Sequence, residues 1–314
     1  MYQQYGGNDS KSTNSYKYKF TVFTPTYNRA HTIERVYESL KVQTFRDFEW
    51  LIVDDGSLDN TRDLIEFWKK EANFDIHYIY KNNGGKHTAI NRGVQEAQGE
   101  LFLIHDSDDS CIPETLERFN YHWESIPLSK RHEFSGVTVL CMDTKGKLVG
   151  DKFPEDICDL SPMKMNALYG IRGEKWGFHK TDVFKEFPFP EIPGENFFAE
   201  GLIWNKMAVK YKIRHVNEML RIYEYTSDGL SASLLKIRIM NPVSTRYYYK
   251  EFNRLPVPFK LRVKNLINYI RFSLHGSVSI RSTVKESGFF LLTILLLPVA
   301  YFFYQKDLSI LKNS

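Results

Sequence analysis

Three carboxylates follow an apolar run in the stretch LFLIHDSDDS, which spans residues 101–110. Like charges as close as Asp106, Asp108 and Asp109 repel each other and raise each other's pKa unless a positive charge lies between them. Two carboxylates at positions i and i+2 can hold a hard divalent cation through their oxygens, and Mg²⁺ or Mn²⁺ held in this way also bridges to substrate phosphates. The spacing therefore predicts a divalent-cation site at Asp106 and Asp108.

A second stretch, NNGGKH at residues 82–87, has the residue types of an anion site. Gly84 and Gly85 let the backbone approach a ligand closely, the free N–H groups of a following helix favour anions, and Lys86 adds a positive charge. The chain contains neither GxxxxGK[ST] nor GxGxxG, which argues against a P-loop and against a Rossmann dinucleotide site. The two stretches together predict a cleft for a nucleotide diphosphate with its cation.

The elements that must position these residues alternate between β-rich runs and segments of helical period. Strands are expected at 20–25, 48–55, 74–81, 100–106, 134–143 and 216–225. Helices are expected at 30–43, 59–72, 87–98, from Pro113 onward, and at 201–211. This alternation predicts an α/β fold with a single, mostly parallel central sheet flanked by helices. Between 144 and 200, turn signals break the pattern.

Polar residues mark the carboxyl ends of the first four strands: TPTYNR, DDGS, NNGGKH and DSDD. Any one of these loops is equally well explained as a turn or a helix cap. In open α/β sheets, however, ligands bind beyond the carboxyl ends of the strands. Four such loops at one edge predict a single polar cleft with an acidic floor.

The blocks TPTYNR, QTFRDFEWLIVDDGSLDNT, NNGGKHTAINRG and ELFLIHDSDD, in this order, resemble the successive signature blocks of the family-2 glycosyltransferases. The resemblance covers residues 19–125 closely and extends more loosely to about 231. It implies the GT-A fold and an inverting, metal-dependent enzyme that uses a nucleotide-diphosphate sugar, here expected to be uridine-based. It is specific to the family and not to one donor sugar or acceptor.

The resemblance also implies roles on the donor side. Pro25, Thr26 and Tyr27 would line the base and ribose pocket. Asp55 would accept a hydrogen bond from the nucleobase, whereas Asp54 is expected to be structural. For the diphosphate and its cation, the resemblance implies Asp108 as the direct ligand of Mn²⁺ or Mg²⁺ and Asp106 as the second carboxylate of the pair, nearer the ribose. Lys86 would face the diphosphate or stabilise the loop over it.

On the acceptor side, the family places an acidic pair, usually Glu-Asp. The matching segment NFFAEGLIW has Glu200 followed by glycine, so the pair is reduced to one carboxylate. An acceptor hydroxyl needs a positioned general base, and we expect Glu200 to be that base, with Glu195 as the alternative and helix capping as the competing role for Glu200.

Several nearby residues are expected to have other roles. Asp109 is expected to cap the following helix, and His105 to be a packed strand residue. Trp176 to His179 lie where such enzymes shape the sugar and acceptor pockets, although a tryptophan is more often part of the core. Asp228 is a candidate loop residue near the donor.

The sign of the charge differs between the two ends of the chain. Residues 234–314 carry 13 Lys and Arg against 3 Asp and Glu, whereas residues 1–233 carry 29 against 35. The rear part holds a basic amphipathic segment at 256–275 and an uncharged run of 17 residues at 288–304, the short edge of a membrane span, with aromatic flanks. We therefore predict a disordered leader (1–18), a GT-A domain (19–233) and a helical, membrane-associated extension (234–314).

We expect residues 234–314 to contact a membrane, with the basic segment binding anionic headgroups and the apolar segment entering the bilayer. The alternatives are that these residues pack on the catalytic domain or form a dimer interface. Membrane contact predicts an enzyme at the cytoplasmic face of the cell membrane, peripheral or anchored at its C-terminus, with a glycan or lipid-linked acceptor in surface-polysaccharide synthesis. The basic residues alternate with apolar ones, which argues against nucleic-acid binding. Three cysteines without a CxxC pair indicate a reducing compartment.

Two other functions compete with this prediction. A nucleotidyltransferase would share the sheet and the metal chemistry, but it would need a GxGTR-like loop where TPTYNR stands. A non-catalytic, membrane-associated scaffold would bind the nucleotide sugar without turnover, and the missing acidic neighbour of Glu200 keeps that alternative open. Sugar transfer or donor hydrolysis would identify an enzyme, whereas binding of the nucleotide sugar without turnover would identify the scaffold.

Overall fold

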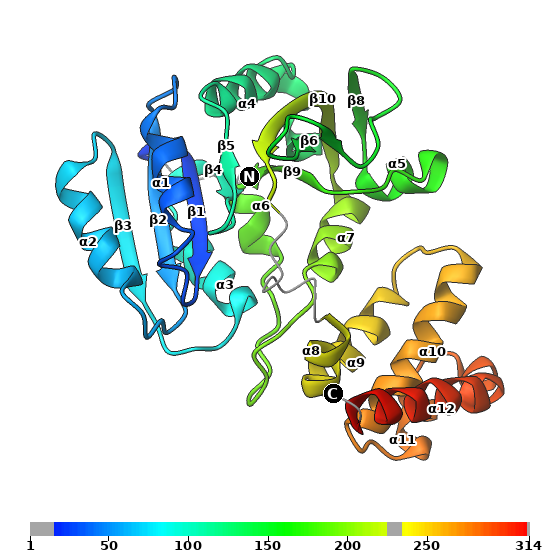
Figure 1. The fold of residues 1–314 in the computed structure, drawn as a ribbon. Coiled ribbons are helices and arrows are strands. Elements are labelled where there is room, and N and C mark those ends of the chain that lie inside the picture. The colour runs from blue at the N-terminus through cyan, green and yellow to red at the C-terminus, as the bar shows by residue number, and fades with distance from the viewer. Residues whose placement is uncertain (1–15, 225–233, 313–314) are drawn as a thin grey trace, which may run out of the picture.

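The computed structural model describes residues 16–224 and 234–312, which form one ten-stranded sheet with flanking helices and a group of C-terminal helices at one end (Figure 1). The strands are β1 (Tyr18–Thr26), β2 (Phe48–Asp54), β3 (Asp75–Tyr80), β4 (Gly99–Ile104), β5 (Ser110–Cys111), β6 (Phe134–Met142), β7 (Leu148–Val149), β8 (Ile157–Leu160), β9 (Lys175–Lys180) and β10 (Lys212–Ile222). The helices are α1 (Glu34–Lys41), α2 (Thr61–Glu71), α3 (Lys86–Glu96), α4 (Thr115–Glu124), α5 (Pro162–Tyr169), α6 (Thr181–Glu186), α7 (Gly201–Lys210), α8 (Leu234–Met240), α9 (Pro242–Phe252), α10 (Phe259–His275), α11 (Ile280–Glu286) and α12 (Phe290–Lys312).

The sheet is parallel in one half and mixed in the other. Its order is β3-β2-β1-β4-β9-β6-β10-β5, and the first four strands are all parallel. β9 then lies antiparallel to both β4 and β6, while β6 and β10 are parallel to each other. The expectation of a mostly parallel sheet is therefore correct for β1–β4 and wrong for the second half, where β9 comes from the segment whose turn signals hid its strands.

One reason for the weak signal of β9 is the glycine at its centre. A Cβ added at Gly177 would lie 2.1 Å from the carbonyl oxygen of Val137 on β6. Only glycine fits this close approach of two backbones, although glycine is unfavourable in strands by its intrinsic preference. The packing of β9 against β6 thus overrides the local preference of the sequence.

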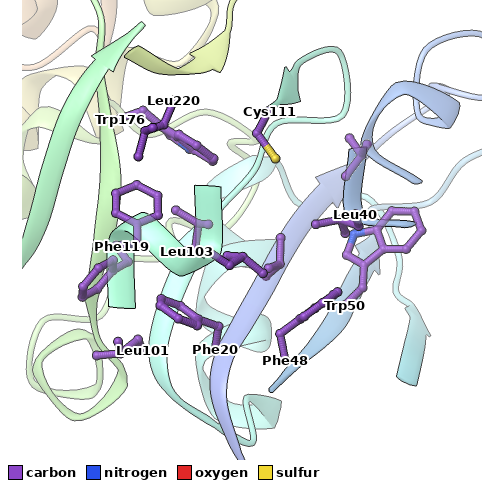
Figure 2. Close-up of a cluster of buried hydrophobic side chains, with 14 of the residues drawn as sticks. Phe20, Leu40, Phe48, Trp50, Leu101, Leu103, Cys111, Phe119, Trp176 and Leu220 are labelled. Carbon is purple, nitrogen blue, oxygen red and sulfur yellow. The ribbon is translucent and has the colours of Figure 1, made fainter. Parts of the chain in front are cut away.

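Apolar side chains fill both faces of the sheet. Figure 2 shows part of the cluster on the face covered by α1 and α4, which contains Trp50 and Phe20 of the parallel strands together with Phe119 and Trp176. The opposite face is covered by α3, α6 and α7. Burial on two faces explains why β2 is buried along its whole length and why its residues 50–53 are an unbroken apolar run.

The C-terminal helices have their own apolar cluster and are joined to the sheet domain through α9. Tyr249 of α9 packs with Tyr269 of α10 and Ala300 of α12, whereas Phe252 of α9 belongs to the cluster under the sheet. The helices predicted at 256–275 and 288–304 correspond to α10 and α12, and α12 continues eight residues beyond the uncharged run, to Lys312. Residues 1–15 of the expected leader lie outside the described residues, and β1 begins at Tyr18.

Candidate active site

The loops at the carboxyl ends of β1–β4 contact one another directly. Asn28, after β1, accepts a hydrogen bond from the backbone of Leu58 and donates its own N–H to Ser57, at 2.8 Å in each case. Asn28 has a φ of 52°, a left-handed conformation that asparagine tolerates better than most residues. The TPTYNR and DDGS loops are therefore fastened together, as the convergence of strand ends predicts.

The residues predicted to line the nucleobase and ribose pocket lie at the end of β1, beside this contact between the two loops. Pro25 and Thr26 are the last residues of β1, and Thr26 is 3% exposed, whereas Tyr27 is 47% exposed. The exposed ring of Tyr27 is thus available to a ligand, while Thr26 contributes to the floor beneath it. Their roles in nucleotide binding remain predictions.

The two carboxylates of DDGS have different partners. Asp54 accepts hydrogen bonds from the Ser57 N–H and the Tyr78 hydroxyl, both at 2.7 Å, which agrees with a structural role. Asp55 is buried and accepts three hydrogen bonds, from the N–H groups of Gly84 and Gly85 and from the ammonium of Lys81, at 2.9, 2.7 and 2.6 Å.

Asp55 therefore shapes the glycine loop. An ionised carboxylate offers about four lone-pair sites, so three bonds leave room for one more donor. A hydrogen bond from a nucleobase to Asp55 remains compatible with this arrangement and stays a prediction.

Gly85 brings the glycine loop against the segment that carries Glu200. Its φ is 91°, and a Cβ at this position would lie 1.8 Å from the carbonyl oxygen of Asn196. Any side chain would push these two segments apart, so the glycine is required here both by its backbone conformation and by the close contact. The contact sets the distance between the start of α3 and the start of α7.

Lys86, the first residue of α3, lies between two carboxylates. Its ammonium nitrogen is 2.7 Å from Oδ1 of Asp106 and 3.0 Å from Oε1 of Glu200. Burial works to lower the pKa of the Lys86 ammonium, but the charges of Asp106 and Glu200 outweigh burial and hold that pKa above its ordinary value. One cation thus joins the predicted metal-side carboxylate to the predicted base.

Arg221 of β10 supplies the second positive charge beside the DSDD segment. Its guanidinium is 3.1 Å from Oδ2 of Asp106 and also pairs with Asp109, and the residue is only 7% exposed. The ring of Trp176 lies under the guanidinium, 5.9 Å from its centre. The three crowded carboxylates are therefore balanced by two cations, Lys86 and Arg221, and only the first of these was predicted from the sequence.

These two cations set the ionisation of Asp106. Burial alone would raise the pKa of the Asp106 carboxyl, but Lys86 and Arg221 outweigh burial and hold the pKa well below its ordinary value. Asp106 is therefore ionised at neutral pH.

Asp109 does not have the predicted role. It is followed by β5, and the next helix, α4, begins only at Thr115 after the N-cap residue Glu114. The Asp109 carboxylate pairs with Arg221 and accepts a hydrogen bond from the backbone of Glu224. Burial, together with the neighbouring charge of Asp106, raises its pKa to about 6 against the opposing effect of Arg221. The prediction of a helix cap was wrong because the chain makes an extra strand before α4.

Asp108 lies beside Asp106 without sharing its position between the two cations. Burial, and then the negative charge of Asp106, raise the pKa of the Asp108 carboxyl. Arg35 donates a hydrogen bond to the backbone oxygen of Asp108 at 3.1 Å and pairs with Glu224 at 2.8 Å, which fixes the turn that carries Asp108.

These residues fit a divalent cation that a substrate helps to hold. Within residues 16–224 and 234–312, no group of three or more His, Cys, Asp or Glu side chains could enclose a metal by itself. Mg²⁺ sites of one or two carboxylates completed by substrate phosphates need no such group. Both oxygens of Asp106 already have cationic partners, which leaves Asp108 as the better direct ligand.

The two candidate bases differ in what their carboxylates contact. Glu200 precedes α7 and makes no side-chain capping hydrogen bond to it, and its carboxylate pairs with Lys86 instead. Glu195 accepts hydrogen bonds from the N–H groups of Val243 and Ser244, at 2.8 and 2.6 Å, at the start of α9. Capping is thus the role of Glu195 and not of Glu200, and Glu200 is the carboxylate that faces the site.

The aromatic residues near β9 belong to the core. Trp176 is 4% exposed and donates its indole N–H to the carbonyl oxygen of Ile104 at 2.6 Å. His179 is stacked on Trp204, and burial lowers the pKa values of His105 and His179 to about 4. His105 is therefore a packed residue, as predicted, directly after the end of β4, and Trp176 and His179 are packed in the core; a role of residues 176–179 in shaping the sugar pocket stays a prediction. Asp228 lies outside the described residues.

The chain is similar in sequence to several proteins described as glycosyltransferases. A family model described as glycosyl transferase family 2 matches residues 21–134. TuaG of Bacillus subtilis, described as a putative teichuronic acid biosynthesis glycosyltransferase, is 35% identical over 240 residues, which cover 75% of this chain and 88% of TuaG. The poly(ribitol-phosphate) β-N-acetylglucosaminyltransferase TarS of Staphylococcus aureus is 37% identical over 178 residues, 55% of this chain and 30% of TarS. Other curated glycosyltransferases are matched over 24% to 64% of their own length.

Solved structures share the fold at low sequence identity. S. aureus TarS 1–349 in complex with UDP-GlcNAc has a TM-score of 0.58 at 18% identity, with 92% of each chain covered. A mannosyltransferase from Pyrobaculum calidifontis in complex with GDP-Man and Mn²⁺ has a TM-score of 0.55 at 16% identity, covering 94% of this chain and 89% of that one. These similarities confirm the predicted fold class.

Proposed function

This chain belongs to glycosyltransferase family 2, and on that premise we propose that it transfers a sugar from a nucleotide-diphosphate sugar to a hydroxyl group of a glycan or lipid-linked acceptor, with inversion at the anomeric carbon. The observation that carries the proposal is the chain of contacts Asp106–Lys86–Glu200 at the carboxyl edge of the parallel strands. It supports the proposal because one ammonium group contacts both the carboxylate expected on the donor side and the carboxylate expected on the acceptor side.

The proposed reaction uses these groups in an in-line displacement. The acceptor hydroxyl gives its proton to Glu200 while its oxygen attacks the anomeric carbon, and the bond from that carbon to the diphosphate oxygen breaks on the opposite face. The ammonium of Lys86 stabilises the negative charge that develops on the departing diphosphate. Because that charge attracts Lys86, donor binding also loosens its pairing with Glu200 and leaves the carboxylate able to accept a proton.

Asp108, assisted by Asp106, would hold Mn²⁺ or Mg²⁺. When bound, the cation supplies Lewis-acid neutralisation of the leaving diphosphate. The pairing of both Asp106 oxygens with protein cations supports Asp108 as the direct ligand. The Mn²⁺ complex of the P. calidifontis neighbour supports a divalent cofactor at the class level.

The donor is proposed to be a UDP-sugar, with Pro25, Thr26, Tyr27 and Asp55 at the nucleoside end. The UDP-GlcNAc complex of TarS supports this choice and a hexosyl or N-acetylhexosaminyl group as the unit transferred. TuaG and TarS, both named for cell-surface polymers, support an acceptor in surface-polysaccharide synthesis. Membrane contact through residues 234–314, at the cytoplasmic face, completes the proposal.

The test is nucleotide release from a panel of UDP-sugars and GDP-mannose, with Mn²⁺ or Mg²⁺ and with chelator, for the wild type and Asp108→Ala. We expect release from one donor that requires the cation and is lost in Asp108→Ala. Arg172→Ala, at an exposed surface position, is the matched control and keeps full activity. Nucleotide binding with no turnover of any donor, with or without lipid-linked acceptors, would instead support the scaffold alternative.

A further inference from the structure

The outward face of α12 is a continuous apolar surface. Exposed fractions of its large apolar side chains run from 37% at Phe303 to 79% at Leu291. These side chains cover most of the circumference of the helix over its first four turns: Phe290, Leu291, Ile294, Leu295, Val299, Tyr301, Phe302 and Phe303. Exposed apolar surface of this kind marks an interaction site in a folded protein.

The opposite face of α12 is fixed to α10, which lies beside it (Figure 1). Leu296 and Ala300 are buried in the cluster of the C-terminal helices. Further along, Asp307 is 1% exposed and pairs with Arg271 and with His275, both on α10. Separation of α12 from α10 would leave the Asp307 carboxylate without these partners, which is strongly unfavourable in a low-dielectric environment.

The outward apolar surface is also too short to cross a bilayer. By composition and length, α12 passes as a candidate span, with a mean hydropathy of 1.3. From Phe290 to Phe303, however, the apolar surface is about 20 Å long at about 1.5 Å per residue, against about 30 Å for a hydrocarbon core. Beyond it, Gln305, Lys306 and Ser309 are exposed. The dimensions fit a helix that lies along the interface.

The C-terminal helices that hold α12 also carry unpaired positive charges. The guanidinium of Arg262 lies over the ring of Phe289, 4.9 Å from its centre, at the start of α12. Among the described residues, six exposed cations of the C-terminal helices have no ion pair: Lys236, Lys260, Lys264, Arg281, Lys285 and Lys306. Anionic headgroups complement such a surface, whereas a second copy of this chain would bring two basic surfaces together.

We propose that α12 lies in the plane of an anionic lipid bilayer, with its outward apolar face among the upper acyl chains, while it stays packed on α10. The proposal rests on the membrane contact put forward above and specifies its form: the chain attaches to one leaflet and does not cross. The basic side chains of α10 and α11 then lie at the level of the headgroups.

Sedimentation with vesicles tests the surface. The full chain is mixed with vesicles of phosphatidylglycerol and phosphatidylcholine, or of phosphatidylcholine alone, at low and high salt. We expect binding to the anionic vesicles that falls with salt, and a loss of at least about tenfold in Leu291→Ser/Leu295→Ser/Phe302→Ser. The matched control Phe67→Ser/Leu128→Ser/Leu168→Ser removes three equally exposed apolar side chains from the sheet domain and keeps wild-type binding.

Equal binding of the two triple variants to anionic vesicles would overturn the proposal. It would also be overturned if the α12 variant kept its vesicle binding but lost self-association, because the surface would then contact a second copy of the chain. Donor turnover measured without vesicles is independent of this result, because none of these side chains lies at the catalytic edge. Retention of turnover shows that the sheet domain of the α12 variant is folded, and a helix content unchanged by circular dichroism shows the same for its C-terminal helices. Failure of the docking surface and failure of the proposed enzymatic function are therefore distinguishable.

Sidedness separates lying in the plane from spanning. The three native cysteines are buried, so Ser309→Cys provides a single exposed thiol near the end of α12. With protein bound to sealed anionic vesicles, a membrane-impermeant maleimide added outside is expected to label Ser309→Cys to the same extent as without vesicles. Protection of this thiol until detergent is added would mean that α12 crosses the bilayer, which would contradict the proposal.

Discussion

The sheet domain and the C-terminal helices place their charges and their apolar side chains in opposite ways. At the carboxyl edge of the sheet, charged side chains are wholly or partly buried against each other, as in the contacts of Arg221 with Asp109 and Asp106. In the C-terminal helices, most cations face outward, and so do the apolar side chains of α12. Buried charges in fixed geometry are typical of a site that acts on a charged substrate, whereas outward apolar and basic surface is typical of one that docks.

The largest effect is expected on the free energy of unfolding when a buried ion pair of the sheet domain is removed. Arg221→Ala leaves Asp106 and Asp109 without a shared partner, and we expect a loss of about 3–5 kcal/mol in the free energy of unfolding. Arg172→Ala, which removes an exposed pair with Asp151, should leave the free energy of unfolding nearly unchanged. Denaturant unfolding of both variants measures the difference, and equal losses would mean that burial does not distinguish these pairs.

The second effect concerns the cation that joins donor and acceptor sides. Lys86→Met is expected to lower the rate constant of transfer by about 10²–10³-fold, because it removes a positive charge that faces the leaving diphosphate. Lys69→Met on the exposed surface of α2 serves as the control and should have no effect. Steady-state kinetics with saturating donor provides the measurement, and an unchanged turnover number would remove Lys86 from the mechanism.

The third effect tests the buried pair of the C-terminal helices. Asp307→Asn is expected to cost about 3 kcal/mol, at the low end for a buried pair, because Arg271 keeps some contact with water. The destabilisation should be local, so hydrogen exchange should become faster in α12 and stay unchanged in β1–β4. Faster exchange throughout the sheet would mean that the two regions unfold as one unit.

The smallest effect is a pH dependence in the same region. Hydrogen bonds and charges from Ser282, Lys250 and Arg246 lower the pKa of Glu286 to about 2. Because this folded-state pKa lies below the pKa of Glu286 in the unfolded chain, the ionised side chain stabilises the fold at pH values above the ordinary pKa of a glutamate. That stabilisation is lost as the pH falls toward 2.

The contribution of Glu286 should stay below about 1 kcal/mol, because its side chain is 38% exposed. Melting temperatures of Glu286→Gln and wild type should therefore differ slightly at pH 7 and converge near pH 2. A difference that persists at pH 2 would show that the charge of Glu286 is not its source.

The parallel half of the sheet was predictable because burial on both faces gives long apolar runs with polar residues at their ends. The same edge rule placed Asp55, Lys86, Asp106 and Asp108 near one another. β9 was not predictable, because its place in the sheet depends on a close backbone contact at Gly177 and not on its own pattern.

Arg221 was missed for a related reason. It lies 112 residues after Asp109 in the sequence, and its partners are known only once β10 is in the sheet. A single arginine within the apolar run MLRIY was the one available signal. The misassigned cap at Asp109 follows from the same missing partner, because an aspartate before a helix is ordinarily read as its cap.

Transfer by Glu200→Gln, compared with Glu195→Gln and wild type, tests the central claim most directly. With the donor that supports nucleotide release, loss of the general base should lower the transfer rate by about 10²–10⁴-fold in Glu200→Gln, with donor affinity retained. Glu195→Gln, whose side chain caps α9, should keep the wild-type transfer rate. Wild-type transfer by Glu200→Gln, or loss only in Glu195→Gln, would contradict the assignment of Glu200 as the base.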